Sequence, residues 1–141
     1  MTIRIIRQTL TTVETPWLVA PILDRDGGIA SDLRGTSAGP LATRLLDEKE
    51  IKGTVGETVT LHEPTGFRAP SLLLAGLGSK AKLDARAAYS AGVAMAKRLA
   101  GKPRDRVAVS LAAVLEVGGP ALVSPLVEGI VVGMQSPGLH K

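Results

Sequence analysis

Short apolar runs separated by turn-forming residues dominate the hydrophobic pattern of this chain of 141 residues. Each run is rich in aliphatic or β-branched residues and is bounded by Gly, Pro, Asp or charged residues, which is typical of strands. In the third run, Val55, Val59 and Leu61 would share one face of a strand, because side chains alternate along it. The predicted strands are residues 2–7, 17–23, 54–61, 71–75 and 107–112.

Apolar residues recur at three- and four-residue steps in other segments, and this spacing predicts helices over 40–50, 84–99 and 122–134. Pro40 stands just inside the start of the first helix. In the second, Asp84 is placed as the N-cap and Gly101 as the end. The last helix either contains Pro125 one turn in or begins there, with Ser124 as its N-cap.

The order of these elements predicts an α/β domain with a mixed sheet. Strand, glycine turn, helix and strand follow one another between residues 71 and 112, which predicts a parallel strand pair with a right-handed crossover. The connection from Leu61 to Ser71 has about nine residues, too few for a crossover helix, so these two strands are antiparallel if they are neighbours. Residues 27–39, rich in Gly, Ser and Thr, are expected to form a loop.

Composition narrows the class of protein. Hydrophobic residues make up 45% of the chain and aromatic residues only 2%, which predicts one domain with an aliphatic core and argues against a stacking platform for single-stranded nucleic acid. The absence of cysteine excludes disulfides, thiolate metal sites and cysteine nucleophiles. Charges interrupt the first apolar run, and no uninterrupted apolar stretch approaches the ~20 residues of a membrane span. We therefore expect a cytoplasmic protein without membrane contact.

The glycine turn carries the first candidate for chemistry. Residues 76–81 fit the pattern G-x-G-x-x-G/A between a strand and a helix, so Gly76 and Gly78 are candidate phosphate- or nucleotide-binding residues. The helix is expected to start near Asp84, which is late for that motif, and no acidic residue ends the next strand to hold a ribose. The alternative is a tight turn that requires positive φ.

Other candidate catalytic or metal-binding residues lack their partners. Residues 35–39 match G-x-S-x-G around Ser37, but no strand precedes this serine, and the histidines are His62 and His140, the latter in the tail. Carboxylates gather without metal-ligand spacing, so we predict no catalytic residue and no metal site. The acidic groups are Asp24 with Asp26, and Asp47 with Glu48 and Glu50.

The positive net charge of the chain is compatible with nucleic-acid binding but does not predict it. The net charge is +4 and the pI is about 9.8, a balance that permits nucleic-acid contact without indicating it. Basic residues gather near the end of the predicted second helix, where they either meet phosphates or complement the helix C-terminus. This group is Arg98, Lys102, Arg104 and Arg106.

Several stretches resemble the N-terminal domain of the leucyl aminopeptidase (cytosol aminopeptidase) family. The order and spacing agree over roughly residues 2–134, and the tail beyond this range departs from the family pattern. The stretches that carry the resemblance are residues 52–61, 72–78, 87–96 and 127–133.

The resemblance implies a three-layer αβα domain, similar to macro domains, with a mixed, mostly parallel sheet of about five to six strands, occupying residues 1–134 before a tail or linker at 135–141. In that family a larger catalytic domain follows, holds two divalent metal ions (Zn or Mn), and removes N-terminal residues from peptides within a hexamer. None of the catalytic domain's motifs occurs here, so the resemblance implies a separated or truncated non-catalytic domain that serves assembly and access to the active site.

Two alternatives to this function remain. One is a macro-like module that binds ADP-ribose or another nucleotide at Gly76 and Gly78. The other is a DNA-binding accessory domain that uses the basic group between Arg98 and Arg106.

Overall fold

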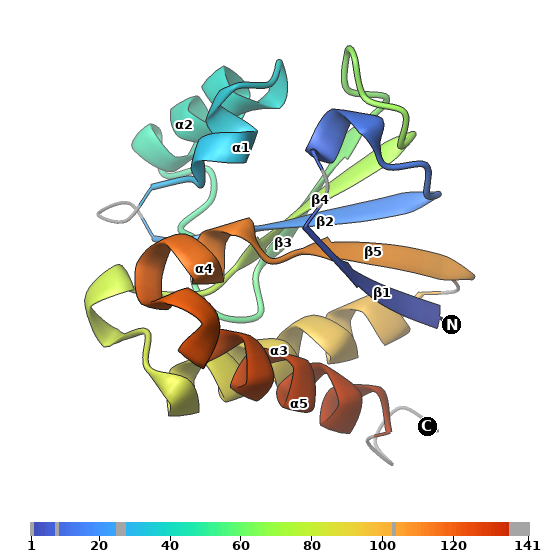
Figure 1. Ribbon diagram of the computed structural model, residues 1–141. Coiled ribbons are helices and arrows are strands. Elements are labelled where there is room, and N and C mark those ends of the chain that lie inside the picture. Colours follow the sequence, from blue (N-terminus) through green and yellow to red (C-terminus); the bar gives the residue numbers. More distant parts are fainter. Residues whose placement is uncertain (1, 8, 25–27, 103, 136–141) are drawn as a thin grey trace.

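The computed structural model describes residues 2–7, 9–24, 28–102 and 104–135. Within them, five strands form one sheet in the order β1-β5-β2-β4-β3 (Figure 1). All neighbours are parallel except β3 and β4, so the predicted mixed, mostly parallel sheet is confirmed. The strands are β1 (Thr2–Ile6), β2 (Trp17–Ile22), β3 (Thr58–His62), β4 (Ser71–Gly76) and β5 (Arg106–Ser110).

The connections of β4 confirm one topological prediction and correct another. The antiparallel pairing of β3 with β4, inferred from their short connection, is confirmed, with Val59 opposite Leu74. The strand–helix–strand segment does not form a direct pair, because β2 lies between β4 and β5 and is parallel to both. The prediction of a paired crossover was wrong because the sequence gives no sign that an earlier strand is inserted between the two.

Helices cover both faces of the sheet, which gives the predicted three layers (Figure 1). Because side chains alternate along a strand, Leu73 and Ala75 of β4 face the layer of α3 (Ala85–Ala100) and α5 (Val123–Met134). Leu72 and Leu74 face the opposite layer, formed by the 3₁₀ turn η1 (Leu10–Thr12), α1 (Ser31–Arg34) and α2 (Ala38–Asp47). Two aliphatic cores result, one on each face.

Glycines allow α3 and α5 to pack closely side by side. A Cβ on Gly92 would overlap the backbone of Leu126, and one on Gly129 would overlap the carbonyl of Tyr89. The predicted cap of α3 is confirmed, since the Asp84 carboxylate accepts a hydrogen bond from the Ala87 N–H at 2.8 Å. The alternative start of α5 with a Ser124 cap is wrong, because the helix begins at Val123.

Several short elements differ from what the sequence predicts. The expected loop 27–39 contains α1 and the start of α2, and a further helix, α4 (Ala112–Gly118), follows β5 directly. The strand predicted from residue 54 begins only at Thr58, and Val55 is 45% exposed instead of facing the core. The reason is a turn at residues 54–57, in which the Glu57 N–H donates to the Thr54 carbonyl at 3.1 Å.

In the described part of the chain, Ala112–Met134 is the one helical segment long and apolar enough to cross a membrane by length and composition alone. Glu116 and Glu128 interrupt this segment, so it contains no uninterrupted apolar run of that length. Such a single segment is weak evidence for a membrane span. Here it bends at Gly119, whose φ is 67°, and its second half packs on α3.

Candidate functional site

A polar cluster lies where β5 ends and α1 and α4 begin. Its members come from distant parts of the chain: Ser31 and Asp32 start α1, Ser110 ends β5, and Glu116 belongs to α4. In open α/β sheets ligands bind outside the carboxyl ends of the strands, so this edge is the first place to look for a site.

Hydrogen bonds to Glu116 connect the start of α1 to α4. Its carboxylate accepts hydrogen bonds from the Ser31 N–H at 3.0 and 3.2 Å and from the Ser31 hydroxyl at 2.5 Å. A carboxylate at this position satisfies an N–H that the short helix would otherwise leave without a partner. Glu116 therefore acts as a side-chain cap supplied from another helix.

Ser110 connects β5 to the same cluster. Its hydroxyl lies 3.4 Å from Asp32 Oδ2 and accepts a hydrogen bond from the Ala112 N–H at 3.2 Å, which helps α4 begin directly after the strand.

Burial raises the pKa of the Asp32 carboxyl above its ordinary value, and the negative charge of Glu116 raises this pKa further. Hydrogen bonds from Leu33 and Ser110 act in the opposite direction and lower it. The cluster holds two acids and two serines, all bonded to one another or to backbone.

The chemistry available to this cluster is limited. No histidine belongs to it, and among the described residues no group of three or more His, Cys, Asp or Glu is placed to hold a metal ion. The hydrogen bonds of Glu116 and Ser110 join α1 to α4 and β5, which is a structural role. The cluster was not predictable from the sequence, because Ser31 and Glu116 are 85 residues apart and residues 27–39 were expected to form a loop.

The glycine turn after β4 is filled by the protein's own backbone. The N–H groups of Gly76, Leu77 and Gly78 donate to the carbonyls of Glu57, Ile22 and Gly53 at 2.8–2.9 Å. A Cβ on Gly76 would overlap the carbonyl of Thr54, and Gly78 has a φ of 89°. These three amides have no donor left for a phosphate, so the geometry favours the tight turn over the nucleotide site.

The remaining candidates for catalysis stay apart. Ser37 is exposed in helical backbone conformation before α2, and its hydroxyl donates to the Thr65 carbonyl at 2.6 Å, so the strand-to-helix geometry of a nucleophile elbow is not formed. His62 is exposed at the end of β3. Asp26 and His140 lie outside the described residues.

The basic group beyond α3 separates into different roles. Arg98 Nε donates to the Gly56 carbonyl at 2.7 Å and holds the turn at residues 54–57 against α3. Arg104 donates to the Leu99 carbonyl at 2.6 Å and lies over the Trp17 ring, 4.6 Å from its centroid, and burial lowers its pKa. Lys102 and Arg106 are exposed. Two of the four basic side chains, Arg98 and Arg104, are therefore engaged in contacts that stabilise the fold.

An open groove lies beside the Arg98 contact. Its volume is about 640 Å³. The Glu57 carboxylate at its rim accepts the N–H groups of Lys52 and Gly53 at 2.9 and 2.7 Å. The groove is lined by Lys52, Thr54, Val55, Gly56, Glu57, Ala94, Lys97 and Arg98.

Comparison with known proteins gives one consistent result. The family model described as "Cytosol aminopeptidase family, N-terminal domain" matches residues 27–134. A probable cytosol aminopeptidase of Stutzerimonas stutzeri is 33% identical over an alignment of 96 residues, with 64% of this chain and 19% of that protein covered. A probable cytosol aminopeptidase of Streptomyces coelicolor is 30% identical over 148 residues, with 94% of this chain and 27% of that protein covered.

A solved structure agrees in fold. A mutant of tomato leucine aminopeptidase matches with a TM-score of 0.61 at 20% identity, over 94% of this chain and 28% of that protein. This chain thus spans between about a fifth and just over a quarter of the length of the relatives it matches.

Proposed function

Because this chain belongs to the cytosol aminopeptidase family as its N-terminal domain, we propose that it is a non-catalytic domain that serves assembly and shapes access to the active site. The relatives extend far beyond the part that this chain matches. The peptidase chemistry is then carried by a catalytic domain of the same polypeptide, where two divalent ions, Zn or Mn, would act on the N-terminal residue of a peptide.

The observation that carries the proposal is an exposed apolar surface on α5. Val131 and Val132 are 46% and 45% exposed, although they belong to a helix whose other face packs closely on α3. Surfaces of obligate assemblies are more apolar than the average protein surface. These valines are therefore candidates for contact with the catalytic domain or with another subunit of a hexamer.

Domain limits and location follow from the same proposal. The domain would occupy residues 1–134, and residues 135–141 would be the linker toward the catalytic domain. The relatives are named cytosol aminopeptidases, which supports a cytoplasmic location.

A peptidase assay tests where the chemistry lies. The 141-residue chain and the full-length gene product are compared on an aminoacyl substrate with Mn²⁺, with Zn²⁺, and after chelation. We expect metal-dependent release of the amino acid only from the longer protein. Hydrolysis by the 141-residue chain would contradict a non-catalytic role, and inactivity of both proteins would contradict the assignment of peptidase activity to the parent.

A further inference from the structure

Arginines meet at the amino-terminal edge of the sheet, far from the polar cluster at its carboxyl edge. Arg4 belongs to β1 and Arg106 begins β5. In the parallel register Arg106 is opposite Thr2, so Arg4 is its diagonal neighbour two residues along. Because side chains alternate along strands, both arginines lie on the same face of the sheet, within reach of each other.

A cavity lies between these arginines. It measures about 170 Å³ and opens beside a wider groove of about 690 Å³. Glu14, Thr15 and Arg106 line both. The smaller cavity is completed by Thr2, Arg4 and Val107, and the groove by Pro16, Arg68 and Pro70.

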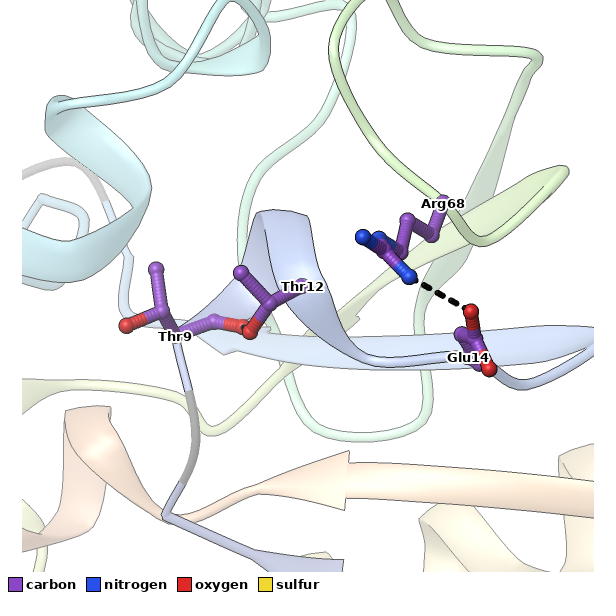
Figure 2. A network of polar contacts seen from close by, with 4 residues as sticks. All are labelled: Thr9, Thr12, Glu14 and Arg68. Carbon is purple, nitrogen blue, oxygen red and sulfur yellow. Dashed lines mark hydrogen bonds and ion pairs between the residues drawn. The ribbon is translucent and has the colours of Figure 1, made fainter.

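Glu14, the acid in this lining, is already engaged. Arg68 Nη1 lies 2.6 Å from Glu14 Oε1, and the Arg68 N–H donates to the Thr11 carbonyl at 3.1 Å, which holds the connection between β3 and β4 against η1 (Figure 2). Neither Arg4 nor Arg106 forms an ion pair with a described residue. Three arginines and one glutamate leave two positive charges uncompensated around the cavity.

Arg4 and Arg106 are both exposed, and as diagonal neighbours on adjacent strands they repel each other only weakly, but together they place positive charge on both sides of the cavity. We propose that the cavity between β1 and β5 binds a tetrahedral oxyanion, the phosphate group of free phosphate or of a phosphomonoester, between Arg4 and Arg106. Planar guanidinium groups donate paired hydrogen bonds to such oxygens. The Thr2 hydroxyl is a further donor, whereas that of Thr15 is used by the Trp17 carbonyl at 3.2 Å.

The adjoining groove gives the rest of a phosphomonoester a place to lie. Pro16 and Pro70 offer apolar contact there, and Arg68 closes one side. Free phosphate would fill only the smaller cavity. The two sources of the phosphate group therefore differ in whether the groove contributes to binding.

Titration of the isotope-labelled 141-residue chain with inorganic phosphate and with glycerol 3-phosphate, at constant ionic strength, tests the site. We expect saturable amide shifts in β1 and at the start of β5. Arg4→Gln and Arg106→Gln should each weaken binding by about tenfold or more, since each removes charge-assisted hydrogen bonds. Arg86→Gln, on the exposed surface of α3, should bind as the unsubstituted chain does. Tighter binding of glycerol 3-phosphate identifies a phosphomonoester, and equal binding identifies the free anion.

Thermal unfolding supplies a second readout that does not depend on detecting the ligand. Without phosphate, Arg106→Gln should unfold at the same temperature as the unsubstituted chain or higher, because repulsion is relieved. At the same concentration, phosphate should raise the unfolding temperature of the unsubstituted chain more than that of the variant. Shifts without saturation, equal weakening by Arg86→Gln, or salt-dependent binding of duplex DNA without saturable phosphate binding would overturn the proposal.

Discussion

At the scale of single residues, Asp32 makes the folding stability of the domain depend on pH. Its pKa is raised by burial, so the folded state holds the proton more tightly than the unfolded state does. The protonated Asp32 carboxyl therefore favours the folded state. Its contribution to stability is fully present below the unfolded pKa of 3.8 and is lost as pH rises through the higher folded pKa. Ionised Asp32 thus lowers the free energy of unfolding at neutral pH.

We therefore expect Asp32→Asn to gain stability relative to the unsubstituted chain as pH rises above about 3.8. The pH-dependent part should be no more than about 1 kcal/mol, because the carboxyl is only half buried and water screens it. Urea unfolding between pH 3 and 7 measures it. Asp47→Asn, exposed at the end of α2, controls for the loss of a negative charge. A difference that stays constant over this range would show that Asp32 ionises equally in both states.

At the scale of elements, the contact between α3 and α5 depends on glycine. Gly129→Ala would place a methyl group against the Tyr89 carbonyl, which belongs to the backbone of α3 and cannot rotate away. We expect a loss of about 1–3 kcal/mol, the usual range for overpacking, in spite of the higher helix propensity of Ala. Urea unfolding followed by circular dichroism measures the loss.

The matched control is Gly35→Ala, where the added methyl group would lie 3.9 Å from the Ser31 carbonyl, an ordinary van der Waals distance. It should change the free energy of unfolding by no more than about 0.5 kcal/mol. If Gly129→Ala stabilised the chain instead, helix propensity would outweigh the close packing and the two helices would have room to separate.

Elements with a strong local pattern were predictable, and those held by distant partners were not. The run of leucines in β4 and the spaced apolar residues of α3 mark a buried strand and an amphipathic helix by themselves. By contrast, α1 has four residues and depends on Glu116, which is 85 residues away from Ser31. The candidate sites share this limit, because Arg4 meets Arg106, and Asp32 meets Ser110, only after the sheet has formed.

At the scale of the whole molecule, the exposed valines of α5 separate stability from assembly. Val131 and Val132 cover little of the core, so replacing both by Lys should leave the unfolding temperature of the 141-residue chain nearly unchanged. If α5 forms the proposed contact in the full-length gene product, the same change would bury two charges without partners, which is costly at an apolar interface. We expect sedimentation velocity to show smaller assemblies, with peptidase activity falling in parallel.

The control adds the same charges to exposed polar positions, Thr43→Lys on α2 and Ser90→Lys on α3. This variant should assemble as the unsubstituted protein does, because neither side chain belongs to the apolar surface. Unchanged assembly in the valine variant would exclude α5 as the contact, and the exposed valines would then have no part in forming the oligomer. Since the valines lie on the layer opposite η1, the oxyanion cavity should bind phosphate equally in both variants.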